Sequence, residues 1–185
     1  MSFINPNEQF NPFSVSNTTR NALMLNLNSS SEISESDILN IIHKNSSYGE
    51  LCLPEDTDIS LTVAGTFYKV PFGAPLINNN LTDNGDSTVS IIIPGVYQIL
   101  SKIDGASSQN NVNIINKIYI NGSPSSNNLT ASRHYQQAGD DGSVSIIGLL
   151  TLQQGDIISL NMSSSVSSTT FTTHSINLVL NKISY

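Results

Sequence analysis

The sequence predicts an all-β fold for residues 58–185, preceded by a mostly irregular extension over residues 1–57. Two observations predict this fold. From about residue 58 the chain consists of short runs in which apolar and polar residues alternate, as in a strand with one buried face. These runs are separated by joints rich in Gly, Asn, Asp and Ser, which is typical of an antiparallel sandwich or barrel and not of a fold with helical crossovers.

The N-terminal extension is rich in Asn and shows no sustained periodicity before "ALMLNL", which predicts one short strand over residues 22–27. Phe3, Phe10 and Phe13 stand singly among polar residues. Isolated aromatic residues on an extended arm fit either disorder or a segment that becomes ordered against a partner. We favour the second reading and expect these three side chains to dock the arm onto another protein.

A short helix is predicted over residues 36–44, within the segment "SESDILNIIHK". A serine at position 34 or 36 is suited to cap its N-terminus, and Asp37 in the first turn complements the helix dipole. One apolar face is formed by Ile38, Ile41 and Ile42. The β-branched residues also favour a strand, so both alternatives stay open at this point.

The strands of the domain follow in chain order. The segment "DISLTVAGTFYKVPF" opens the domain, and Asn84-Gly85 marks a tight turn. The other predicted strands are 88–93, 96–103, 112–120, 143–152, 156–162 and 173–183. Pro94-Gly95 interrupts an apolar run, and because proline cannot donate a ladder hydrogen bond, we interpret the pair as a corner between two strands.

Several of these strands are apolar on both faces. In 96–103, Tyr97 and Ile99 point to one side and Leu100 to the other, because successive side chains alternate. In 143–152, Ile147 and Leu149 point away from the remaining apolar residues. An antiparallel sandwich needs only one apolar face per strand. A second surface, either the 1–57 extension or a neighbouring subunit, is therefore expected to cover the other face.

Composition excludes several classes of partner. The chain of 185 residues has 11% charged residues and a net charge of −7, and its seven Lys and Arg residues are scattered. No basic cluster exists to neutralise nucleic-acid phosphates or to bind a membrane surface, so neither partner is expected. The first residues lack the apolar core of a secretory signal, so we expect synthesis in a host cytoplasm without export by that route.

No catalytic, metal or cofactor site is predicted. The three histidines are far apart in sequence and none has a metal-type partner nearby. Cys52 lies beside acidic residues, which would raise the pKa of its thiol, so we interpret it as structural. The acidic loops "PEDTDIS", "TDNGDS" and "GDDGS" lack a complete calcium pattern and are explained by turn formation. We therefore expect a protein that is not an enzyme.

The segment "IIIPGVYQILSKI", followed later by Gly142, alternating apolar residues, Gly155-Asp156 and the closing "HSINLVLNKISY", resembles the C1q/TNF-like jelly-roll family. The resemblance covers roughly residues 58–185. It implies an antiparallel two-sheet jelly roll that assembles as a homotrimer. No collagen-like repeat precedes the domain, and the Asn/Ser-rich composition without disulfides looks most like such domains on bacteriophage virions.

This resemblance implies a function by assembly. We expect a virion structural protein, a trimeric head fibre or capsid-decoration protein, whose residues 1–57 dock onto other capsid or tail proteins. The residues expected to be buried around the threefold axis are Tyr97, Ile99, Ile147, Leu149 and Leu178. An alternative is a receptor-binding tip protein that reads a host surface glycan. The candidate ligand loop for that alternative, within residues 128–142, carries Arg133, His134 and Tyr135, and a plain surface loop is its competing interpretation.

Overall fold

The computed structural model describes residues 34–53, 57–73 and 77–183, and it divides the chain after Ile41 into two units. The predicted docking residues Phe3, Phe10 and Phe13 and the predicted strand 22–27 lie outside the described residues. The first unit ends within helix α2, Glu35–Asn45, where the sequence predicted a helix over 36–44. Among the described residues no helix is both long and apolar enough to cross a membrane.

Helix α2 begins with a hydrogen-bonded cap. The Asp37 backbone N–H donates to Ser34 Oγ at 3.2 Å, and the Ser34 N–H donates to Asp37 Oδ2 at 3.1 Å. This reciprocal pair satisfies donors that the first turn leaves without an intrahelical partner. The Ser34 hydroxyl also donates to Asp37 Oδ2 at 2.7 Å, and this bond, together with the one from the Ser34 N–H, holds the pKa of the Asp37 carboxyl below its ordinary value. Position 34 is therefore the cap. The segment forms a helix and not the strand that its β-branched residues also favoured.

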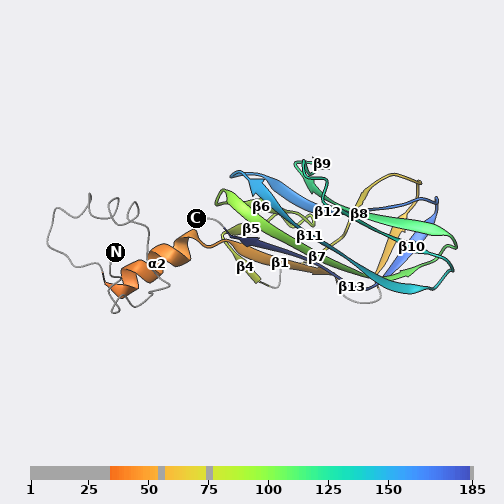
Figure 1. The fold of residues 1–185 in the computed structure, drawn as a ribbon, viewed down its shortest axis with the longest axis horizontal. Coiled ribbons are helices and arrows are strands. Elements are labelled where there is room, and N and C mark those ends of the chain that lie inside the picture. Colours follow the sequence, from red (N-terminus) through yellow and green to blue (C-terminus); the bar gives the residue numbers. More distant parts are fainter. Residues whose placement is uncertain (1–33, 54–56, 74–76, 184–185) are drawn as a thin grey trace, which may run out of the picture. The chain divides into compact units, whose positions relative to one another are not determined.

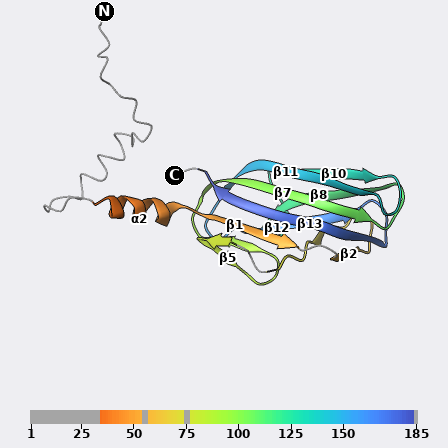
Figure 2. The same ribbon diagram turned by 90° about the horizontal axis from the view of Figure 1, so that it is seen from below.

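The second unit is an all-β sandwich of two antiparallel sheets, as predicted (Figure 1). Sheet A has six strands in the order β11-β7-β13-β1-β4, with β2 also paired to β13. Figure 2 shows β11, β7, β13 and β1 side by side in this sheet. The strands of sheet A are β1 Tyr48–Leu53, β2 Asp58–Leu61, β4 Ile77–Asn79, β7 Gly95–Ser107, β11 Asp141–Leu152 and β13 Thr169–Lys182.

Sheet B has seven strands in the order β10-β8-β12-β6-β5, with β3 paired to β12 and β9 to β8. Its strands are β3 Tyr68–Lys69, β5 Leu81–Asp83, β6 Val89–Ile91, β8 Val112–Ile120, β9 Ser123–Pro124, β10 Thr130–Tyr135 and β12 Ile157–Ser164. The core lies between the two sheets, and both contribute fully buried apolar side chains such as Ile99, Leu150, Leu160 and Leu178.

Residues 48–53, which the sequence analysis assigned to the extension, form an integral strand of sheet A. Strand β1 pairs with β13 on one side and with β4 on the other. Its alternation of exposed and buried residues is clear, with Leu51 and Leu53 in the core. The sandwich therefore begins at or before Tyr48 and not at residue 58, because β1 cannot be removed without exposing its two neighbours.

The Pro94-Gly95 pair is the corner that the sequence predicted. It joins β6 in sheet B to β7 in sheet A, so the chain passes from one layer to the other at this point. The buried Tyr97 side chain holds the corner, because its hydroxyl donates a 2.6 Å hydrogen bond to the carbonyl oxygen of Ile93. Burial is also the main reason why the pKa of Tyr97 lies above its ordinary value.

Gly105 of β7 allows β7 and β13 to approach closely. A Cβ atom at this position would lie 2.3 Å from the Thr172 carbonyl oxygen and 2.8 Å from the Phe171 ring. The carbonyl belongs to the backbone of the neighbouring strand, so it cannot move aside as a flexible side chain would. This position needs glycine because of packing, not because of its backbone angles.

We predict that Gly105→Ala lowers the free energy of unfolding by about 1–3 kcal/mol, which is the usual effect of overpacking a core. Gly73→Ala is the matched control, because a Cβ there would meet nothing within 4 Å. Urea unfolding monitored by circular dichroism measures both variants. Equal midpoints for the two variants would contradict the close approach at Gly105.

Candidate self-association surface

The outer face of sheet A carries a row of side chains that crosses five strands. The strand register places Ile147 opposite Leu100, Leu100 opposite Val179, Val179 opposite Glu50, and Glu50 opposite Ile77. Four of these five residues are apolar. We call this set the apolar row.

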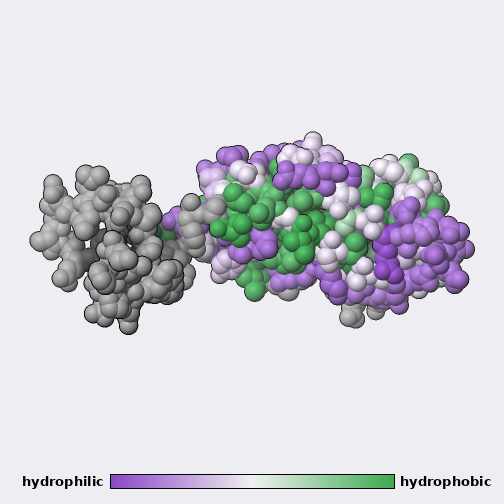
Figure 3. Space-filling model, viewed as in Figure 1, coloured by the Kyte–Doolittle hydropathy of each residue, from purple (hydrophilic) through white to green (hydrophobic). Residues whose placement is uncertain are grey.

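The two ends of the apolar row are the most exposed. Ile147 on β11 is 65% exposed and Ile77 on β4 is 55% exposed, whereas Leu100 and Val179 between them are half-buried. The adjacent row carries Leu149 on β11, 49% exposed, and Tyr48 on β1, 43% exposed, with the amides of Gln98 and Asn181 between them. In Figure 3, hydrophobic residues gather over the part of the sandwich where Figure 1 draws β7 and β11. Side chains of this size lose favourable burial free energy when left in water.

A shallow groove of about 300 Å³ lies on the same face, over β1, β4, β7 and β13. Its lining includes the apolar side chains of Tyr48, Ile77, Leu100 and Val179. The polar groups around it are uncharged amides except for Glu50, whose carboxylate accepts a 3.2 Å hydrogen bond from Asn177 Nδ2. The groove therefore offers apolar contact and no set of groups arranged for chemistry on a substrate.

The opposite end of the same face is polar. His174 Nε2 lies 2.8 Å from Asp141 Oδ1, an interaction between β13 and β11 that passes over β7. Beside it, Thr172 Oγ1 donates to Asp58 Oδ1 at 2.7 Å. Sheet A is thus divided along its strands into an apolar half and a half with charged groups. The hydrophilic residues at the far end of the sandwich in Figure 3 agree with this division.

The predicted trimer interface is wrong for three of its residues. Tyr97, Ile99 and Leu178 are 0% exposed and lie in the core between the sheets. Their side chains point inward because they share the pleat of the core-facing positions, so a partner cannot contact them. Ile147 and Leu149 of the same prediction are on the surface. The sequence missed Tyr48 and Ile77, because β1 and β4 were not predicted as strands.

The predicted ligand loop is a strand. Arg133, His134 and Tyr135 lie in β10 and alternate between its two faces. His134 is exposed, and its Nδ1 lies 3.0 Å from Asn113 Oδ1. Tyr135 is buried, and this burial raises the pKa of its hydroxyl to about 12. The three side chains therefore do not converge on one ligand.

Arg133 and Tyr135 instead hold β10 against β11. Arg133 Nη2 donates to the Asp141 carbonyl oxygen at 3.0 Å, and the Tyr135 hydroxyl donates to the Gly142 carbonyl oxygen at 3.3 Å. Further along, Asn127 Nδ2 donates to the Leu149 carbonyl oxygen at 2.9 Å. Because successive carbonyls of a strand point to opposite edges, Arg133 and Asn127 bind acceptors on one edge of β11, whereas the Gly142 carbonyl points to the other. The edge is therefore partly closed against the addition of another strand.

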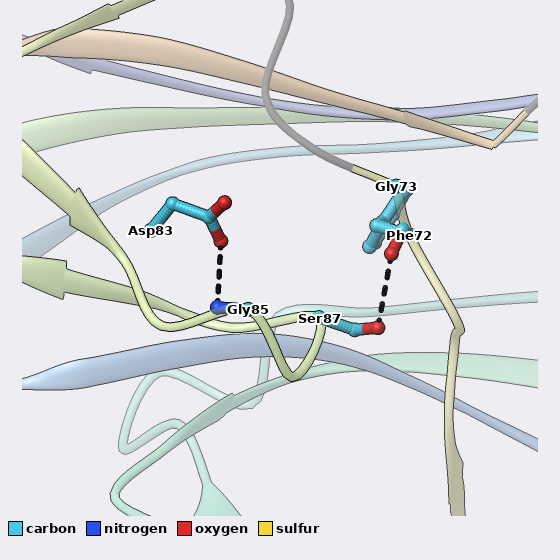
Figure 4. A pocket seen from close by; sticks show the side chains of 5 residues that line it. All are labelled: Phe72, Gly73, Asp83, Gly85 and Ser87. Atoms are coloured by element: carbon cyan, nitrogen blue, oxygen red, sulfur yellow. Dashed lines mark hydrogen bonds between the residues drawn. The ribbon is translucent and has the colours of Figure 1, made fainter.

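A second hollow, of about 290 Å³, lies between residues 72–73 and one of the acidic loops (Figure 4). The Asp83 carboxylate accepts a 3.0 Å hydrogen bond from the Gly85 N–H, and Ser87 Oγ donates to the Phe72 carbonyl oxygen at 3.1 Å. These groups shape the turn. Across residues 34–53, 57–73 and 77–183, no three His, Cys, Asp or Glu side chains group closely enough to hold a metal ion.

Comparison with known proteins identifies the fold. No family model matches the chain, and no curated protein matches it in sequence. Among solved structures, murine APRIL at pH 5.0 has a TM-score of 0.54 and 16% identity, covering 75% of this chain and 99% of that chain. The globular domain of zebrafish complement 1qA has a TM-score of 0.51 and 15% identity, with the same coverage of 75% and 99%.

The Eiger TNF structure from S. frugiperda has a TM-score of 0.54 and 10% identity, covering 76% of this chain and 95% of that chain. At such low identities the likeness concerns the fold alone. It shows that the sandwich is a C1q/TNF-like jelly roll, as the resemblance in the sequence implied.

Cys52 gives a chemical probe of this surface. Its half-buried side chain lies on the outer face of β1, and its Sγ lies 3.6 Å from Glu50 Oε1. Burial and the Glu50 carboxylate both raise the pKa of the thiol. A raised pKa leaves less thiolate at a given pH, and the thiolate is the reactive form.

We predict that Glu50→Gln accelerates alkylation of Cys52 by iodoacetamide at pH 8. The gain should be below about tenfold, since a tenfold gain corresponds to a full pKa unit. Asp86→Asn is the matched control, because that carboxylate pairs with Lys69 in sheet B. Equal alkylation rates for wild type and Glu50→Gln would contradict the effect of the carboxylate.

Proposed function

We propose that this chain is a non-enzymatic structural protein of a bacteriophage virion, a homotrimeric head fibre or capsid-decoration protein. In this proposal the jelly roll is the exposed head, and the residues before β1 dock onto capsid or tail proteins. The protein would be made in the host cytoplasm and function on the particle. The observation that carries the proposal is the exposed apolar row on sheet A.

The position of the exposed residues supports a ring of copies. The most exposed members of the apolar row, Ile147 and Ile77, lie on opposite sides of sheet A. A contact between the Ile147 side of one copy and the Ile77 side of the next joins two different surfaces. Contacts of this kind form a closed ring when the rotation between copies is suitable, and a threefold ring is the smallest, because a twofold dimer joins identical surfaces.

The virion assignment is supported by composition. Only 11% of residues are charged, and the single cysteine allows no intrachain disulfide. Stability outside a cell would then depend on burial within the sandwich and between copies. The alternative is a tip protein that binds a host glycan. Its candidate ligand residues Arg133 and Tyr135 instead form hydrogen bonds between β10 and β11, so they do not support a glycan site.

The virion location is tested on the purified phage particles that carry this gene. Gold-labelled antibody raised against the chain is expected to decorate heads in electron micrographs. Labelling of tail tips alone would favour the receptor-binding alternative. Absence of the chain from the particle proteins, measured by mass spectrometry, would overturn the virion proposal while leaving the homotrimer untouched.

We predict that Ile147→Ser/Leu149→Ser converts the trimer to a monomer at micromolar concentration. Each buried side chain of this size contributes about 1.5–3 kcal/mol, and the trimer repeats the loss three times. Ile157→Ser is the matched control, because Ile157 is 41% exposed on β12 of sheet B. Sedimentation velocity gives the mass. A wild-type chain that sediments as a monomer would refute the homotrimer itself.

A further inference from the structure

Helix α2 carries exposed apolar side chains. Ile38 is 43%, Leu39 53% and Ile41 45% exposed. Ile38 and Ile41 are three residues apart and so share one side of the helix, whereas Leu39 points to a different side. A helix of 11 residues is marginally stable alone, so packing of this side is needed to keep it folded.

The C-terminal end of α2 is fixed to sheet A. Only residues 46 and 47 separate α2 from β1. The Ser46 carbonyl oxygen accepts hydrogen bonds from Asn79 Nδ2 at 3.0 Å and from Asn80 Nδ2 at 2.6 Å. The Ser47 carbonyl oxygen accepts one from the Lys182 N–H at 2.8 Å. Residues 46 and 47, which lead from the helix into β1, are therefore held against sheet A in every copy.

That position lies at the apolar half of the proposed interface. Tyr48, the first residue of β1, belongs to the row next to the apolar row, whereas Asp141 and His174 lie at the other end of the sheet. Copies that bury the apolar half against each other bring the starts of their β1 strands together. The helices attached to them are then held at high effective concentration, which makes even a short contact favourable.

We propose that α2 packs with the α2 helices of two further copies as a parallel three-helix bundle, which buries Ile38 and Ile41 along its axis. The residue type is compatible with three helices, because isoleucine at both the a and d positions of a heptad shifts helix association from dimers to trimers or tetramers. The spacing from Ile38 to Ile41 is that of an a and a d position. This proposal rests on the homotrimer proposed above and adds a second contact between copies.

The test uses the full chain with Cys52→Ser and a nitroxide label on Ser36→Cys. Ser36 is exposed and lies on the side of the helix away from Ile38 and Ile41. Sedimentation velocity first gives the number of copies, and pulsed electron paramagnetic resonance then gives the distance between labels. Bundled helices lie 8–10 Å apart, so we expect one narrow distance of roughly 20 Å between labels.

The variant Ile38→Ser/Ile41→Ser is expected to remain a trimer through sheet A but to broaden this distance distribution. The matched control, Ile92→Ser/Ile157→Ser, replaces two isoleucines that are 42% and 41% exposed outside α2 and should leave the distance unchanged. A trimer with long or broad distances in the wild type would overturn the bundle while the homotrimer stands. A monomer would overturn both, and the two failures are distinguished by the mass.

Discussion

The alternation of side chains along β7 and β13 is the constraint on which the rest of the structure depends. These two strands pair along most of their length, and their inward positions fill the core with residues such as Ile99 and Leu180. The pleat then forces the intervening Leu100 and Val179 outward. An apolar outer face is thus a direct result of consecutive apolar residues in a strand whose register the core already determines.

The same alternation explains what the sequence could and could not predict. The bounds of strands β8 and β11 were predicted closely, because core-facing apolar residues recur at every second position in both. Strands β4 and β5 were missed because each has three residues, too few to show a period. Strand β10 was predicted as part of a loop. Its inward side includes Ala131 and Arg133, and an arginine is not typical of a core-facing position.

The interface was predicted only in part for a related reason. The sequence shows that Tyr97 and Leu100 point to opposite sides of one strand, but it does not show which side faces the second sheet. That choice depends on how β6 and β7 connect, with the corner at Pro94-Gly95 and the Tyr97 hydroxyl bound to Ile93. Tertiary structure, and not local pattern, therefore determined which residues became surface.

Side chains cover part of the β11 edge, and this bears on the proposed association through the face of sheet A. An open edge strand offers backbone groups to any other strand and leads to indefinite pairing. Here Asn127 and Arg133 occupy two β11 carbonyl oxygens that share one edge of the strand. In the proposed assembly, contact through the outer face depends on matching side chains and not on backbone hydrogen bonds.

The polar half of that face then limits how two copies can be placed. If a copy slid along the strand direction, the carboxylates of Asp58 and Asp141 would be pressed against the apolar row of its neighbour. Burying a carboxylate against apolar side chains costs free energy, because the carboxylate loses its contact with water. The apolar row supplies the attraction, and the charged end excludes the shifted arrangements. Together they favour one defined assembly over non-specific adhesion of the apolar surface.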